Sequence, residues 1–230
     1  MTAPHLIIFD CDGTLVDSQH VIVAAMEHAF LEAGQAAPAR EAVLSIVGLS
    51  LPEAISRVKE IHAIPQDDAL LNRLLEGYKG AFNMLRQDPA HEEPMFPGAR
   101  DGVLALAARD DVVLGIATGK SRRGVDRLIR VRGLEGCFAT IQTADDAPSK
   151  PHPGMIEQAM NETGSAPEAT LMIGDTTFDI EMAVNAGVTA IGVEWGYHPA
   201  EALHEAGADL VAEDFKTLLA AIDGHRRGAE

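Results

Sequence analysis

The chain of 230 residues is poor in cysteine, in aromatic residues and in long apolar runs. Its two cysteines, Cys11 and Cys137, form no CxxC pair, so the sequence supports neither a disulfide framework nor a zinc site. No apolar run approaches the roughly 18 residues that span a bilayer. Residues 1–5 lack the cationic and apolar layout of a signal sequence. We therefore expect a cytoplasmic protein.

Positive charge is scarce as well. Lysine and arginine together number 18 against 35 acidic residues, which leaves a formal net charge of −17. Such a chain repels nucleic acids and anionic membranes, and we expect neither as a partner. A site for an anionic substrate must then carry its own cations, whether Lys, Arg or a metal ion. The 47% of apolar residues suffices for a substantial core.

The most informative segment is the apolar run over residues 6–9, which leads directly into Asp10 and Asp12. A short apolar run that stops at Asp and Gly predicts a buried parallel strand, with both carboxylates at its carboxyl end. Ligands of open α/β sheets bind at that edge. Taken alone, the Asp-x-Asp-Gly pattern fits a solvated turn equally well.

Three later segments also place polar residues at the ends of predicted strands. One strand runs into Thr118 and Gly119 before a helix start, where a hydroxyl and free backbone N–H groups can bind an anion. Lys150 stands among prolines, which makes it a stiff point charge for phosphate. Another strand runs into Asp175, and Asp179 follows shortly after it. The order of these segments predicts one site at one sheet edge.

The pattern between residue 18 and about residue 88 is helical, and it contains no strand-like run. Pro89, Pro94 and Pro97 then mark the return to alternating helices and strands. Strands separated by helices predict an α/β fold, a doubly wound (Rossmann-like) parallel sheet with a small helical insertion after the first strand. Expected elements are helices within 21–30, 42–47, 52–61 and 68–85, helix 98–109, strand 112–117, helix 121–132, a short strand near 141, helix 154–163, strand 170–173, helix 177–186, strand 189–193 and a frayed tail over 225–230.

Together these segments resemble the motifs of the haloacid dehalogenase-like hydrolases, in the branch that looks like phosphoglycolate phosphatase. The matching residues are Asp10-Cys11-Asp12-Gly13-Thr14, Thr118-Gly119, Lys150-Pro151 and Gly174-Asp175 with Asp179, and Trp195-Gly196-Tyr197 also fits this branch. The resemblance extends from residue 6 to about residue 222. It implies a catalytic core of residues 1–17 and 90–230, with residues 18–89 as a mobile helical cap and hinges at 16–20 and 88–97.

The resemblance also implies a mechanism through an aspartyl-phosphate. Asp10 is the expected nucleophile, while Thr118 and the Gly119 N–H bind the phosphoryl oxygens. A bound Mg²⁺ and Lys150 are expected to hold the pKa of Asp10 low. Asp12 passes a proton to the leaving oxygen and takes one from the attacking water, a role that nearby negative charge favours by keeping it partly protonated.

Magnesium prefers hard oxygen ligands in octahedral geometry, and the expected set is Asp10, the carbonyl of Asp12 and Asp175. Asp179 is expected to act one layer further out, by orienting a ligand water or Lys150. The expected partner is a small phosphorylated metabolite, and the chain is expected to be a monomer or a homodimer.

Several other activities compete with this hypothesis. Asp12 favours phosphate transfer over dehalogenation, because a halide leaves without a proton. Phosphohexomutases of the family carry a cap His and a cap Arg where this chain has Ile22 and Leu51, which disfavours a mutase. Pyrophosphatase and nucleotidase activities remain open because they use the same residues. A receiver-like phospho-acceptor domain is the alternative from another class, although such domains are usually smaller. A non-catalytic binding protein fits poorly with four intact motifs.

A few further residues invite a functional role, but a structural one is favoured for each. Cys11 is expected to be a buried structural residue, because its side chain points away from those of its neighbours. His152 fits a solvated loop, Asp145 a solvated acidic turn, and Arg57 with Lys59 the solvated face of a helix.

Overall fold

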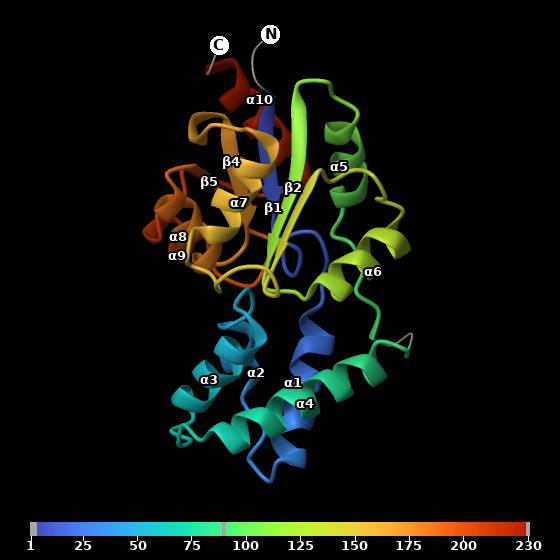
Figure 1. Cartoon of the computed structure of the whole chain (residues 1–230), viewed down its shortest axis with the longest axis vertical. Helices are drawn as coiled ribbons and strands as arrows, with labels where there is room; N and C mark the ends of the chain where they lie inside the picture. The colour runs from blue at the N-terminus through green and yellow to red at the C-terminus, as the bar shows by residue number, and fades with distance from the viewer. Residues whose placement is uncertain (1–3, 89–90, 229–230) are drawn as a thin grey trace.

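A six-stranded sheet forms the centre of the molecule, with all neighbouring strands parallel and in the order β3-β2-β1-β4-β5-β6 (Figure 1). The computed structural model describes residues 4–88 and 91–228. The strands are β1 (His5–Phe9), β2 (Val112–Thr118), β3 (Thr140–Thr143), β4 (Thr170–Gly174), β5 (Thr189–Val193) and β6 (Leu210–Ala212). The predicted α/β class with a doubly wound parallel sheet is confirmed.

Helices cover both faces of this sheet. They are α5 (Ala99–Ala107), α6 (Arg122–Arg132), α7 (Gly154–Thr163), α8 (Thr177–Ala186), α9 (Ala200–Glu205) and α10 (Phe215–Gly228). Because side chains alternate along a strand, Ile7 and Phe9 pack toward α5 and α10, whereas Leu6 and Ile8 pack toward α7, α8 and α9. A strand buried on both sides explains why β1 is a continuous apolar run in the sequence.

A lobe of four helices lies beyond the carboxyl ends of the strands (Figure 1). This helical lobe consists of α1 (Gln19–Glu32), α2 (Arg40–Leu44), α3 (Leu51–Ile61) and α4 (Asp68–Leu85). It has its own apolar core, in which Met26, Phe30, Ile55 and Leu74 are buried. α4 begins at an N-cap, where the Asp67 carboxylate accepts hydrogen bonds from the next turn. Among the described residues, no helix is both long and apolar enough to cross a membrane.

The two chain segments that join the helical lobe to the sheet run side by side. Asp17 N donates to Pro94 O at 2.8 Å, and Phe96 N donates to Leu15 O at 3.0 Å. These segments coincide with the two predicted hinges, except that residues 89–90 lie outside the described part of the chain. The division into a core and a cap that ends at residue 89 stays a prediction.

The observed elements depart from the sequence-based expectation mainly at the carboxyl end. We expected no element beyond residue 193, yet α9, β6 and α10 follow there. The prediction of a frayed tail is wrong for residues 225–228, which continue α10, and residues 229–230 lie outside the described part. The His225 ring packs edge-on against the His5 ring, 6.2 Å between centroids, which gives the last turns of the helix a contact on the sheet.

Candidate active site

Asp10 is the first residue after β1, and the backbone of the neighbouring strand holds it in place. Asp10 N donates to Ile173 O at 2.9 Å, and the residue has no solvent exposure. Its Oδ1 accepts a hydrogen bond from Lys150 Nζ at 2.7 Å. Its Oδ2 is buried and has no hydrogen-bond partner among the described residues. One oxygen of this carboxylate is therefore held, and the other is free to react or to bind a cation.

Lys150 joins two of the predicted site residues. In addition to Asp10, its Nζ contacts Asp179 Oδ1 at 2.5 Å, and its side chain is fully buried. The other oxygen of Asp179 accepts from Thr176 N at 3.0 Å and from Thr176 Oγ1 at 2.6 Å at the start of α8. Asp179 therefore contacts the same ammonium as Asp10, as one of the two roles predicted for it requires. The role itself stays a prediction.

Burial dominates the electrostatics of Asp10. It raises the pKa of this carboxyl from 3.8 to about 6, even though the charge of Lys150 opposes the rise and that of Asp179 adds to it. We expected Lys150 to help hold this pKa low. Its effect has the expected direction, but the burial of the carboxylate is the larger influence.

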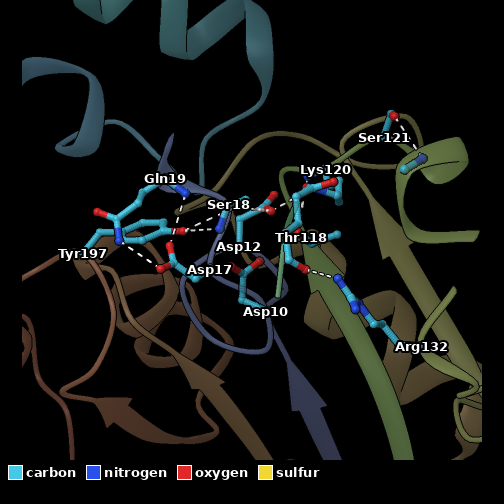
Figure 2. Close-up of polar contacts among 12 residues, drawn as sticks. Asp10, Asp12, Asp17, Ser18, Gln19, Thr118, Lys120, Ser121, Arg132 and Tyr197 are labelled. Carbon is cyan, nitrogen blue, oxygen red and sulfur yellow. Dashed lines mark hydrogen bonds and ion pairs between the residues drawn. The ribbon is translucent and has the colours of Figure 1, made fainter. Parts of the chain in front are cut away.

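Asp12 lies in the loop after β1, where two donors converge on one of its oxygens. Ser18 Oγ donates to Asp12 Oδ1 at 2.6 Å, and Lys120 Nζ lies 2.7 Å from the same atom. Figure 2 shows Tyr197, Ser18, Asp12 and Lys120 as a chain of polar contacts across the site. The second oxygen of Asp12 is left free of these two contacts.

Lys120 is a site residue that our sequence analysis did not single out. Its Nζ also lies 3.2 Å from Glu93 Oε1, and its side chain is only 9% exposed. Burial lowers the pKa of Lys120, but the charges of Asp12 and Glu93 outweigh that effect and raise it. The expectation that negative charge dominates around Asp12 is therefore incomplete, because a permanent cation contacts its side chain directly. The sequence feature that could have identified Lys120 is its position two residues after Thr118, at the end of a predicted strand.

Thr118 ends β2 and is buried, and its Oγ1 accepts a hydrogen bond from Lys120 N at 3.3 Å. Gly119 lies directly under the backbone of the helical lobe. A Cβ at this position would stand 2.5 Å from the carbonyl oxygens of both Gly48 and Leu49, so no side chain fits there. The lobe thus rests on the segment that was predicted to bind phosphate.

Asp175 follows β4 and is held from two other loops. Thr14 Oγ1 donates to its Oδ1 at 2.8 Å, and Tyr197 N donates to its Oδ2 at 2.9 Å. A Cβ at Gly196 would stand 2.1 Å from the Asp175 Cβ, which explains the glycine beside Tyr197. The Tyr197 hydroxyl accepts from Ser18 N at 3.0 Å, so this tyrosine connects Asp175 to the loop of Asp12. Our sequence analysis used Tyr197 only as a family feature.

Asp10, Asp175 and Asp179 form a buried acidic group whose carboxylate oxygens lie within 4.8 Å of one another. Burial raises the pKa of Asp175 well above its usual range, and the charges of Asp179 and Asp10 add to this. Lys150 contacts two of the three carboxylates, those of Asp10 and Asp179. Excess negative charge, hard oxygen donors and the free Oδ2 of Asp10 together fit a divalent cation such as Mg²⁺.

A cavity of about 500 Å³ separates the sheet edge from the helical lobe. Its floor includes Asp10, Asp12, Thr118 and Gly119, so the structure brings four of the predicted site residues to one enclosed space. Of the other predicted residues, Lys150 contacts Asp10 and Asp179 directly. Asp175 belongs to the same acidic group, with its carboxylate oxygen within 4.8 Å of those of Asp10 and Asp179. The side chains opposite this floor come from α1, α3 and α4 and from the segment between α2 and α3.

Of the residues for which we favoured a structural role, four do not line the cavity, namely Cys11, His152, Arg57 and Lys59. Cys11 is buried, and its burial raises the pKa of the thiol. His152 is exposed and accepts from Gly154 N at 3.0 Å, and Arg57 pairs with Glu60 at 3.3 Å. Lys59, however, is not on a solvated face: it is fully buried and donates to the Asp67 carbonyl at 3.3 Å.

Asp145 differs from these residues, because it lines the cavity. Its Oδ2 accepts a hydrogen bond from Arg122 N at 2.9 Å, at the first residue of α6. The acid therefore caps a helix N-terminus, which is more than the solvated turn that we expected.

Comparisons with known proteins agree with this fold. The family model for haloacid dehalogenase-like hydrolases matches residues 7–193, and this chain belongs to that family. The resemblance inferred from the four motifs is thus confirmed.

Three curated relatives align over nearly the whole chain. The "Probable phosphatase IndB" of Dickeya dadantii is 35% identical over 94% of this chain and 92% of its own length. A phosphoglycolate phosphatase of Pseudomonas putida is 31% identical over 95% and 79%, and the pyrophosphatase PpaX of Oceanobacillus iheyensis is 31% identical over 93% and 94%. Among solved structures, a hydrolase from Pseudomonas syringae superposes with a TM-score of 0.84 at 28% identity, covering 96% of this chain and 98% of that one.

Proposed function

We propose that this hydrolase is a Mg²⁺-dependent phosphatase that cleaves a small phosphate monoester through an aspartyl-phosphate intermediate. The observation that carries the proposal is the pair of differently held carboxylates at the cavity floor. Asp10 has one oxygen on Lys150 and one without a partner, while Asp12 is held by Ser18 and Lys120. Relatives named as phosphatases support the same activity.

In the proposed reaction, Asp10 Oδ2 attacks phosphorus and the bond from phosphorus to the ester oxygen breaks. Asp12 delivers a proton to that departing oxygen and later takes one from the water that hydrolyses the acyl phosphate. Lys150 keeps the attacking carboxylate oriented, and Thr118 with the Gly119 N–H binds the phosphoryl oxygens as charge develops. A Mg²⁺ held by Asp10, Asp175 and the Asp12 carbonyl would supply charge neutralisation at the phosphoryl group.

The decisive experiment measures phosphate release from a panel of monoesters, nucleotides and pyrophosphate, with Mg²⁺ and with a chelator. We expect turnover only with the metal, no turnover for Asp10→Asn, and a loss of about 10²- to 10⁴-fold in kcat for Asp12→Asn. Asp101→Asn is the matched control, because that side chain is 91% exposed. Near wild-type rates in either site variant would contradict the assignment.

Pyrophosphatase or nucleotidase activity is the second candidate, which the relative named as a pyrophosphatase supports. It uses the same floor of the cavity and differs only in the group that leaves, so the substrate panel separates it from the first. Phosphosugar mutase activity is disfavoured, since Ile22 and Leu51 stand at the positions of the mutases' cap His and of the cap Arg that grips a second phosphate. Both line the cavity as apolar side chains. A stable phospho-Asp10 without phosphate release would instead indicate a phospho-acceptor domain.

A further inference from the structure

The position of Asp12 tells where the organic part of a substrate must lie. An acid that protonates the leaving oxygen stands within hydrogen-bond reach of it, so the carbon bonded to that oxygen lies close to Asp12. Asp12 is in turn bonded to Lys120, and Lys120 Nζ stands 5.6 Å from the centroid of the Phe82 ring on α4. The side chains around Lys120 and Phe82 are therefore among those near which the organic part lies.

Phe82 belongs to an aromatic surface on α4. The Tyr78 and Phe82 rings are stacked with centroids 5.7 Å apart and an interplanar angle of 26°, and both line the cavity. Burial raises the pKa of Tyr78, and the negative charge of Asp12 adds to the rise, so this residue presents a neutral phenol toward the site. Leu75 continues the same helix face by one turn.

The rest of the cavity wall on the lobe side is apolar as well. It is made by Ile22, Met26, Ile46, Val47, Leu49 and Leu51. No charged side chain stands among these six positions, and the lining cations lie elsewhere. Four cations line the cavity outside this wall. Lys120 pairs with Asp12 and Glu93, Lys79 pairs with Glu76 at 3.1 Å, and Arg123 bonds Asn83 at 3.2 Å. Arg86 lies 5.9 Å from the centroid of the Phe82 ring. A carboxylate that lay against these six apolar side chains would lose its hydration without gaining a counter-charge from them.

The volume of the cavity also favours a substrate with a large organic group. A cavity of about 500 Å³ falls within the range of roughly 300 to 1,000 Å³ that drug-sized ligands occupy. Small acids such as phosphoglycolate, or pyrophosphate itself, would leave most of this space to water along apolar walls. Such water is readily displaced by an apolar group.

We propose that the substrate is a phosphate monoester of an alcohol whose organic group carries an apolar face at least as large as an aromatic ring, and that Phe82 and Tyr78 select it. This inference rests on the proposed phosphatase function and narrows its substrate class. It separates the chain from its relatives named for phosphoglycolate and pyrophosphate.

The test compares 2-phenylethyl phosphate with ethyl phosphate, because both release a primary alcohol and differ only in the added ring. We expect wild-type kcat/KM to be at least about tenfold higher for the phenyl compound, a gain of the size that burying a ring provides. This preference should fall about tenfold in Phe82→Ala and partly in Phe82→Leu. Met84→Ala, on the exposed side of the same helix, should keep it. Because the two substrates share the same chemical step, the ratio of their kcat/KM values cancels any effect of a variant on that step.

A wild-type ratio near one, a higher kcat/KM for phosphoglycolate, or an unchanged ratio in both Phe82 variants would overturn the inference. Calorimetric binding of 2-phenylethylphosphonate and ethylphosphonate gives a second readout that needs no turnover. If wild type releases phosphate from no compound, the proposed function fails, and the phosphonates still decide the inference. Tighter binding of the phenyl compound by about tenfold supports it, whereas equal affinity contradicts it.

Discussion

At the scale of single residues, Asp10 is a carboxyl whose burial raises its pKa from 3.8 to about 6. Between these two values the unfolded chain has lost the proton that the folded chain still holds, so stability falls as pH rises. The effect amounts to about 3 kcal/mol when complete. In chelator, we expect Asp10→Asn to gain stability over wild type by up to about this amount between pH 4 and pH 7, measured by urea unfolding. Parallel pH profiles for the two proteins would refute the effect.

Lys120 is the residue whose removal most directly tests how Asp12 is held. Lys120→Met leaves the carboxylates of Asp12 and Glu93 near each other without the cation that now contacts both at 2.7 and 3.2 Å. We expect kcat to fall about 100-fold, because a misplaced acid transfers its proton poorly. Steady-state kinetics measure the change in kcat, and the exposed Lys216→Met variant serves as the control. A change of less than threefold would mean that Lys120 has no part in the reaction.

How far the sequence predicts the site depends on the kind of contact. Asp10, Thr118 and Asp175 follow apolar runs, and parallel strands bring such positions to one edge by rule, so their proximity was predictable. The contact between Lys120 and Asp12 joins residues 108 positions apart, and that between Tyr197 and Asp175 is set by a loop. Neither follows from periodicity, because side-chain direction in loops depends on the packing of the finished fold.

At the scale of elements, the helical lobe contacts the sheet edge through several loops, and the loop after β2 is one of them. Gly119 has no left-handed backbone, so alanine is conformationally allowed there, yet its Cβ would meet two lobe carbonyls at 2.5 Å. We therefore expect Gly119→Ala to shift the lobe and lower kcat/KM at least tenfold while the core stays folded. Gly80→Ala in α4, where a Cβ meets nothing within 4 Å, should keep activity and gain up to about 1 kcal/mol.

Activity assays together with thermal unfolding separate these two glycine variants. Full activity in Gly119→Ala would show that activity does not depend on this close contact between Gly119 and the lobe. A Gly119→Ala protein that fails to fold would show that the contact stabilises the whole chain, and not only the position of the lobe.

The elements predicted most accurately from the sequence are those with the strongest apolar patterns. Strands β4 and β5 and helices α7 and α8 were predicted within a residue, because both have strong apolar patterns between glycine and proline signals. α2 ends at Leu44, three residues before the expected end, since the chain turns toward Gly48, whose φ of 100° a helix cannot contain. β6 was missed because three residues, one of them exposed, carry too little periodicity.

At the scale of the whole molecule, the net charge of −17 opposes the binding of an anionic substrate at the site. An acidic surface repels phosphate compounds at long range, so their binding must come from groups inside the cavity. Lys150 and Lys120 are both buried against acids there, which keeps them charged without presenting them to solvent. This arrangement explains why few cations suffice in a chain that handles an anion.

The pairing of the two linkers has a consequence for how such a protein changes over evolution. Because Asp17 bonds Pro94 and Phe96 bonds Leu15, the chain leaves the sheet and returns to it at one place. An insertion whose ends meet can be exchanged, lengthened or redesigned without moving any strand. The lobe is in this sense a replaceable module, and new substrates become accessible to an unchanged reaction centre through recombination of that one segment.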